Sequence, residues 1–339
     1  MADIKDSTMY LSSVPIETSF LLVGKDNLIG EASNKIEVTR ENLHDLAMAT
    51  IKAYPEEFQG KPFCIISGAT EPGETFSNAE HFVPEGLGFG WTALPRGTGT
   101  CDRINAIFGE YELEWLRFGS MGIYRPFFVG KGKDDAPEFY APKKTDSVFQ
   151  FKRDENGNRV IILTSDKKLP TPEPDKSGRM VITVPVTRPS SAAISLSLHK
   201  MAYLAIWLSN PGIIFDSAFV PLLTFLNNLT AETYRPYTEQ MIAGAEPGVS
   251  LRFLVHMREK TEERGNERRV FAIERIFAAI RAHHLLYFLS LVGNLSDMPQ
   301  DGLTPQTYVP IGSGRKTTTG FSVHFDRIVT SADDERTKA

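Results

Sequence analysis

The sequence predicts an α+β fold, and three observations lead to that prediction. The 339 residues are 41% hydrophobic and 23% charged, a balance that excludes collagen, coiled coil and general disorder. Segments with helical spacing of apolar residues occur, and one of them is apolar almost throughout. A late segment, 251–293, alternates like an antiparallel meander. The length allows one large domain or two or three ordinary ones.

The sequence of the N-terminal part predicts a hairpin, a helix and a glycine-rich loop of defined conformation, in that order. The run 19–33 has apolar flanks around a turn at 25–27, which is typical of a hairpin. The run 40–54 places apolar residues at helical spacing, and Pro55 ends the pattern. A short apolar run at 63–66 then leads into a segment rich in glycine and proline.

The middle of the chain predicts a second helix and two strands between loops. Residues 102–118 place apolar side chains largely on one side of a helix that starts near Asp102. The segments 131–147 and 165–178 are rich in Lys, Asp and Pro, and we interpret them as loops or linkers. Between and after them, 158–165 and 178–186 are expected to be strands.

The C-terminal part predicts one core helix and a meander. Residues 191–212 form the most hydrophobic helix candidate, and Pro211 with Gly212 ends it. Within 251–293 we expect antiparallel strands with one turn at Gly265 and Asn266, while a helix remains an alternative for 273–291.

Charge, cysteine content and the chain ends indicate a cytoplasmic protein. The net charge is −5, but residues 1–124 hold 9 Lys+Arg against 18 Asp+Glu (9 − 18 = −9), whereas the remainder holds 28 against 24 (+4). Phosphate contacts are therefore expected mostly from the later part. Two cysteines cannot build a disulfide framework. No secretory signal, lipidation motif or uninterrupted membrane span is found, so no membrane association is expected.

One motif carries the functional prediction. Residues 80–88 read EHFVPEGLG, and residues 101–105 read CDRIN at a helix start. This pattern resembles the HNH endonuclease family, in the bacterial branch with two cysteine knuckles around a Glu-His motif. The resemblance covers about residues 61–133, and Ser195 with His199-Lys200 is similar to a Ser-x-x-x-His-Lys helix often found downstream.

The resemblance implies a small ββα-metal finger, embedded in a larger domain with an antiparallel sheet and a hydrophobic helix. It implies that Glu80 and Asn105 bind one divalent metal, Mg²⁺ or Mn²⁺, and that His81 activates water for phosphodiester hydrolysis. Both ligands are oxygen donors, which suit a hard cation that keeps several waters. A neutral histidine is available as a general base near physiological pH. Adjacent residues on a strand point to opposite faces, so Glu80 and His81 can serve one phosphate only if the loop curls.

The sequence departs from the family at both knuckles. Where the family has Cys-x-x-Cys, this chain has Cys64 with Ser67 and Cys101 with Ile104. No structural zinc is therefore expected. If the finger keeps its shape, Cys64 and Cys101 lie close enough to be tested for a disulfide, although the cytoplasm normally keeps thiols reduced.

Other candidate residues each have a structural alternative. Phosphate contacts are expected from a set of later residues, Arg125, Lys131, Lys133, His199 and Lys200, although a charged loop or a core histidine would also explain them. Asp102 favours the N-terminal end of a helix over a metal site. His283 and His284 look like a metal pair, but a strand would point their rings apart. The basic residues between Arg252 and Arg281 are balanced by acids and are compatible with a solvated face.

These observations give four expected segments and two classes of function. The segments are an N-terminal hairpin and helix (1–60), the HNH-like finger (61–133), a linker with short strands (134–178) and an α+β domain (179–330). The favoured function is metal-dependent cleavage of DNA or RNA, which the resemblance associates with phage defence or mobile elements. The alternative is an inactive HNH-derived binding or structural module, for which a protein partner or a homo-oligomer is expected. A third possibility is an accidental motif in a binding protein with no nuclease history, which would be favoured if residues 80 and 105 lay far apart.

Overall fold

The computed structural model confirms an α+β fold. It describes residues 12–24, 27–117, 121–122, 139–140, 147–153, 159–165, 173–174, 180–187, 189–228, 235–242, 248–262, 268–298 and 318–325. The chain divides into two compact units, Met1–Leu116 with Ser190–Gly314, and Arg117–Pro189 with Arg315–Ala339. The first unit contains the Glu-His motif and all the site residues described below.

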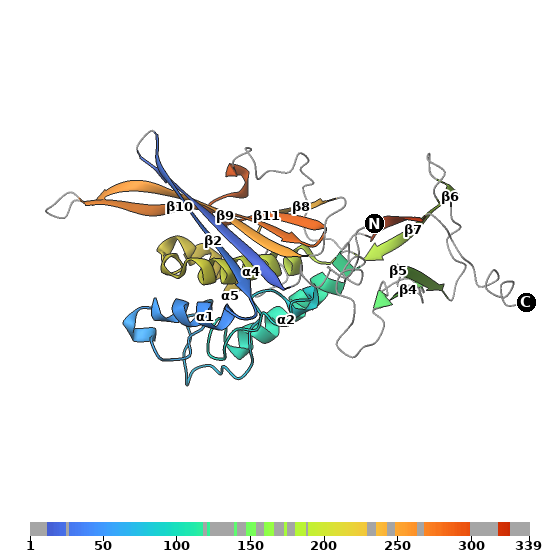
Figure 1. Cartoon of the computed structure of the whole chain (residues 1–339), viewed down its shortest axis with the longest axis horizontal. Helices are drawn as coiled ribbons and strands as arrows, with labels where there is room; N and C mark the ends of the chain where they lie inside the picture. Colours follow the sequence, from blue (N-terminus) through green and yellow to red (C-terminus); the bar gives the residue numbers. More distant parts are fainter. Residues whose placement is uncertain are drawn as a thin grey trace, which may run out of the picture. The chain divides into compact units, whose positions relative to one another are not determined.

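A six-stranded sheet is the framework of the first unit, in the order β2-β1-β9-β10-β11-β8 (Figure 1). Its strands are β1 (Ser13–Val23), β2 (Leu28–Thr39), β8 (Tyr237–Met241), β9 (Val249–Glu262), β10 (Arg268–Ala282) and β11 (Leu285–Val292). The predicted hairpin is β1 with β2, and its register pairs Ile16 with Ile36. β1 also runs parallel to β9, with Phe20 opposite Val255. The N-terminal hairpin is therefore part of the same sheet as the C-terminal strands.

The predicted meander is confirmed as β9, β10 and β11, which pair antiparallel in sequence order. The alternating apolar residues of these strands reach the core, where Ile276, Phe277 and Leu289 are completely buried. The helical alternative for 273–291 is wrong. The turn expected at residues 265 and 266 lies outside the described residues.

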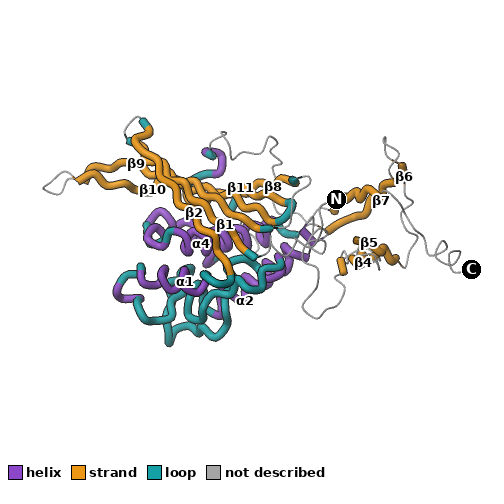
Figure 2. Tube along the Cα trace, in the orientation of Figure 1, coloured by secondary structure: helices purple, strands orange, loops and turns teal. Residues whose placement is uncertain are grey.

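The helices described in the first unit gather on one side of this sheet (Figures 1 and 2). They are α1 (Leu43–Lys52), α2 (Asp102–Arg117), α4 (Ser191–Ser209) and α5 (Val220–Asn227). Single 3₁₀ turns, η2 to η6, occur at Glu56–Phe58, Glu85–Leu87, Pro211–Ile213, Ser217–Phe219 and Leu295–Asp297. The predicted helices 40–54, 102–118 and 191–212 correspond to α1, α2 and α4. The short helix α5 was not predicted.

The core helix α4 packs against β1, β9, β10 and β11. It begins at Ser190, whose hydroxyl accepts a hydrogen bond from the Ala193 amide at 3.2 Å. Near its end the Trp207 indole donates to the Tyr54 hydroxyl at 3.0 Å, which ties α4 to the residues after α1. In length and apolarity α4 could cross a membrane, but 94% of that window is buried inside the protein. Its composition is thus that of a core helix.

The second unit contains two small antiparallel sheets among its described residues. One has the order β3-β4-β5, built from Phe139–Tyr140, Ser147–Arg153 and Arg159–Ser165. The other has the order β12-β7-β6, built from Thr318–Phe325, Met180–Thr187 and Glu173–Pro174. The strands predicted at 158–165 and 178–186 correspond to β5 and β7.

The two compact units differ from the four expected segments because strand pairing joins distant parts of the chain. Strands β1 and β2, from the expected 1–60 segment, lie in one sheet with β8 to β11 from the 179–330 segment. The 134–178 segment and part of the 179–330 segment lie together in the second unit.

Candidate functional site

The Glu-His motif lies in an irregular hairpin directly before α2. His81 and Ala93 form an antiparallel bridge, and the Leu94 amide donates to the Glu80 carbonyl at 2.7 Å. The loop between the two paired segments contains the 3₁₀ turn η3. This turn ends at Gly88, which has a left-handed φ of 89°. A hairpin followed by a helix is the order that the resemblance implies. The hairpin nevertheless has a single isolated bridge, so a regular ββα finger is not confirmed.

Glu80 and Asn105 lie close together, as the prediction required. Asn105 is in the first turn of α2, and its side-chain amide donates to the carbonyl of Ala79 at 3.1 Å. Gly99 permits this packing because its φ is +78° and a Cβ there would meet Leu94 Cδ1 at 2.9 Å and Glu80 Cγ at 3.5 Å. The distance between residues 80 and 105 that would have favoured an accidental motif is therefore not found.

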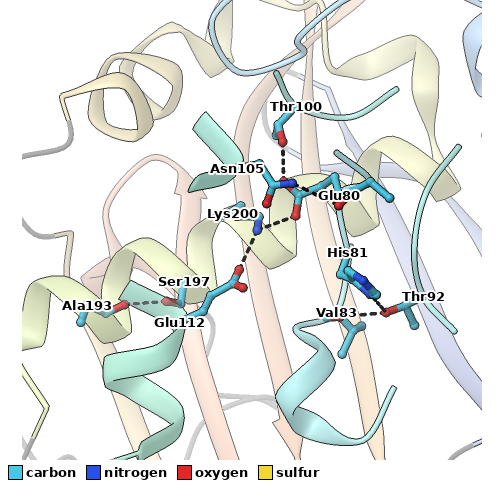
Figure 3. A network of polar contacts seen from close by, with 11 residues as sticks. Glu80, His81, Val83, Thr92, Thr100, Asn105, Glu112, Ala193, Ser197 and Lys200 are labelled. Atoms are coloured by element: carbon cyan, nitrogen blue, oxygen red, sulfur yellow. Dashed lines mark hydrogen bonds and ion pairs between the residues drawn. The ribbon is translucent and has the colours of Figure 1, made fainter. Parts of the chain in front are cut away.

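The Glu80 carboxylate is buried and is held by protein donors at both oxygens (Figure 3). Lys200 Nζ lies 2.6 Å from Glu80 Oε1, and the Thr100 hydroxyl donates to Glu80 Oε2. The same ammonium lies 2.6 Å from Glu112 Oε1, and 5.4 Å from the centre of the Phe108 ring. Glu80 and Lys200 are each only 1% exposed. We call Glu80, Lys200 and Glu112 the buried ion network.

The buried ion network keeps Lys200 charged. Burial alone would lower the pKa of Lys200, but the charges of Glu112 and Glu80 outweigh it and raise that pKa. Burial raises the pKa of Glu112, although Lys200 opposes the shift. The Glu80 side chain is 1% exposed and that of Glu112 is 14% exposed, so we interpret Glu80 and Lys200 as the more deeply buried ion pair.

His81 lies beside this network but faces another way. Figure 3 shows its ring turned toward Thr92, whereas the Glu80 carboxylate turns toward Lys200 and Thr100. His81 Nδ1 is 3.4 Å from the Thr92 hydroxyl, which itself donates to the Val83 and Phe89 carbonyls. Burial lowers the pKa of the half-buried His81, and the charges of Glu85 and Glu80 oppose this shift. The ring is therefore neutral at physiological pH, as a general base requires.

The residues present do not fit the divalent metal that the resemblance implies. A cation at Glu80 would have to displace the Lys200 ammonium or the Thr100 hydroxyl, because both carboxylate oxygens are taken. Within the part of the chain that the structure describes, no three His, Cys, Asp or Glu side chains form a group that could hold a metal ion. Asn105 supplies one remaining oxygen, which is a poor site on its own.

The two segments expected to resemble cysteine knuckles contain free, buried cysteines. The Ser67 amide donates to Cys64 Sγ at 3.4 Å, and the Gly68 amide donates to the Cys64 carbonyl at 2.8 Å. Cys101 precedes α2, and Ile104 is completely buried in the core where the family has a thiolate. The Cys64 and Cys101 thiols lie near enough to each other that each shifts the pKa of the other. The predicted proximity of the two cysteines is confirmed.

Asp102 has the structural role that the sequence favoured. It begins α2, and its carboxylate accepts hydrogen bonds from the Thr75 hydroxyl at 2.6 Å and from the amides of Ser77 and Asn78. These bonds lower the pKa of Asp102 to about 2. Asp102 therefore fixes the loop that leads into Glu80.

Three histidines outside the motif, His199, His283 and His284, are buried. His199 Nδ1 is 2.7 Å from the Ser195 carbonyl and the ring packs on Phe225, so a phosphate contact by His199 is wrong in this structure. The strand expected for His283 and His284 is also wrong, because they form the turn between β10 and β11, with a φ of 56° at His283. His283 accepts from the Gly248 amide at 3.1 Å, and its other nitrogen lies 3.1 Å from the Leu87 carbonyl. This contact supports the loop that follows His81.

The other proposed phosphate contacts receive little support. Arg125, Lys131 and Lys133 lie outside the described residues. Lys200 is buried in the ion network, so it cannot reach a phosphate from there. On β9 and β10, Arg258 pairs with Glu274 at 3.0 Å, which agrees with a solvated face of paired charges.

Sequence reasoning missed Glu112, Thr100 and Thr92. A signal for the first was present: a lysine in the middle of an apolar helix needs a buried acid as its partner. The hydroxyl groups carry no comparable signal, because any threonine near a turn has the same local pattern. No family model, curated protein or solved structure matches the chain. The HNH resemblance therefore stays a prediction based on the two motifs.

Proposed function

We propose that this chain is a non-cleaving relative of HNH endonucleases that serves as a binding or structural module. One observation carries the proposal: the Lys200 ammonium occupies the carboxylate that the family would use for its metal. The hairpin, α2 and α4 then form a rigid framework held by an internal cation. Glu80 is then unavailable as a metal ligand for cleavage, although His81 is still present beside it.

The energy of the buried pair favours this proposal over retained cleavage. Removing one partner from a buried pair costs about 3–5 kcal/mol, and a metal that displaces Lys200 must overcome a cost of that size. Since 1.4 kcal/mol is tenfold in affinity, the displacement weakens metal binding by roughly 10²- to 10³-fold. Mg²⁺ also gives up its waters reluctantly and depends on carboxylate ligands.

The charge distribution favours a protein partner over nucleic acid. Residues 1–124 carry the motif and have a net charge of −9 (9 Lys+Arg minus 18 Asp+Glu). A phosphate backbone would be repelled by such a surface unless metal ions intervened. A protein partner or a second copy of the chain is compatible with it.

Metal-dependent cleavage is the second candidate, and His81 is the observation in its favour. Its ring is half-buried, held by Thr92 and neutral, which are properties of a general base. In this alternative Glu80 and Asn105 would hold Mg²⁺ or Mn²⁺ after Lys200 moves away, and the ion would stabilise the developing charge on phosphate. His81 would take a proton from water.

A nicking assay separates the two candidates. Purified wild type and His81→Ala are incubated with supercoiled DNA and with RNA in the presence of Mg²⁺ or Mn²⁺. We expect neither protein to cut under any metal while both remain folded by circular dichroism. Metal-dependent cutting by wild type that His81→Ala abolishes would overturn the proposal and establish the nuclease.

A further inference from the structure

Two thiols are brought together by backbone pairing of two distant segments. The Phe63 amide donates to the Gly97 carbonyl at 3.3 Å and the Ile65 amide to the Gly99 carbonyl at 2.9 Å. These bonds align residues 63–65 with 97–99, so the side chain of Cys64 meets Cys101 at the start of α2. The two sulfurs interact closely enough for each to shift the pKa of the other, and both cysteines are 0% exposed. Their closeness is thus fixed by the fold and not by chance contact at a surface.

The surroundings of the pair make the two thiols unequal. The Ser67 amide donates to Cys64 Sγ, and with the hydrogen bond from Cys101 it stabilises a thiolate. The hydrogen bond from Cys101 is the largest cause of the lowered pKa of Cys64, while the same bond raises the pKa of Cys101. One sulfur is therefore the nucleophile and the other holds the shared proton.

A groove lies beside the segment that follows Cys64. Residues Ile65, Ile66, Ser67 and Gly68 line an open groove of about 680 Å³, together with residues from α4, α5 and the segment between them. Gly68 has a left-handed φ of +73°, and no atom lies within 4 Å of where its Cβ would be. A small movement of this turn would open Cys64 to a reagent in the groove.

We propose that Cys64 and Cys101 form a reversible thiol–disulfide site that reacts with low-molecular-weight disulfides. The Cys64 thiolate attacks a glutathione disulfide, forms a mixed disulfide and releases one glutathione thiolate. Cys101 then attacks the Cys64 sulfur, loses its proton and releases the second glutathione. Two protein thiols and one disulfide thus become one protein disulfide and two thiols. The bond would join the first knuckle to the start of α2, on either side of Glu80 and His81.

The test is made on the reduced, folded full-length chain. The protein is incubated in oxidised glutathione, quenched in acid, denatured with N-ethylmaleimide and weighed by intact mass spectrometry. We expect wild type to lose the mass of two hydrogen atoms, to take up no maleimide and to unfold at a higher temperature than its reduced form. Cys101→Ser is expected to keep one glutathione on Cys64, because no second thiol releases it.

Two outcomes would overturn the proposal. One is a wild type that still takes up two maleimides after the incubation, although the same protein oxidises readily when it is unfolded. The other is a wild type that keeps a stable glutathione adduct, which would mean that Cys101 cannot reach Cys64. Both results are independent of whether the chain cleaves nucleic acid.

Discussion

Replacement of Lys200 by Met tests the buried ion network. The side chain keeps its length but loses its charge, so the buried Glu80 and the partly buried Glu112 remain without a counter-ion. Lys200 has two contacts of 2.6 Å, and its side chain is 2% exposed, so solvent cannot replace the lost partner. We expect a loss of about 3–5 kcal/mol in the free energy of unfolding at pH 7. Urea unfolding followed by circular dichroism measures it.

The pH dependence of Lys200→Met provides an internal check. Without the ammonium, burial raises the pKa of the carboxyl groups in the folded state above about 4.3, the ordinary value for Glu. A raised folded pKa gives stability that is present in acid and is lost as the pH rises through that pKa. The variant is therefore expected to lose more stability relative to wild type at pH 8 than at pH 5.5.

Two further variants control the Lys200→Met experiment. Lys52 is exposed in the last turn of α1, and Lys52→Met is expected to change stability by less than about 0.5 kcal/mol. Adding Glu80→Gln to Lys200→Met removes one uncompensated charge and should recover part of the loss. A loss below about 1 kcal/mol in Lys200→Met, with no pH dependence, would refute the buried network as described.

Two other predictions concern the site's backbone and the acid stability of the fold. Gly99→Ala is expected to lower the free energy of unfolding by about 1–3 kcal/mol, because Gly99 has a left-handed φ and a Cβ there would lie 2.9 Å from Leu94 Cδ1. Gly109→Ala, at an open position of α2, should instead stabilise the protein. Chemical denaturation of both variants measures the difference, and equal effects would contradict the prediction. Burial lowers the pKa of His199 to about 3. The unfolded chain therefore binds a proton at this histidine below about pH 6.5, whereas the folded chain does not. His199 alone is expected to lower the free energy of unfolding by about 2 kcal/mol between pH 6.5 and pH 5. His199→Gln should reduce that fall while exposed His44→Gln leaves it unchanged, and an unchanged fall in His199→Gln would contradict the assignment.

Local patterns in the sequence were sufficient for most elements of the fold. The apolar run of α4 and the alternation of β9 to β11 are properties of neighbouring residues, so periodicity reveals them. The parallel pairing of β1 with β9 could not be predicted in the same way, because the two strands are separated by most of the chain. Strand partners at that distance are selected by packing of the whole core and have no local signal.

The candidate site was only partly predictable for the same reason. The resemblance implied that Glu80 lies near Asn105 and Cys64 near Cys101, and the structure brings both pairs together. The ion pairing depends on Lys200, which lies 88 positions after its second partner Glu112 and on another helix. The sequence motif identifies Glu80 as a possible ligand, but it does not show that Lys200 occupies the Glu80 carboxylate.

The most direct test of the central claim is a Mn²⁺ titration followed by electron paramagnetic resonance of the free ion. Wild type, Glu80→Gln, Lys200→Met and the double variant are compared as full-length proteins. We predict no bound Mn²⁺ at Glu80 in wild type, one bound ion in folded Lys200→Met, and none in the double variant. Binding of one Mn²⁺ by wild type that Glu80→Gln abolishes would contradict the claim that Lys200 replaces the metal.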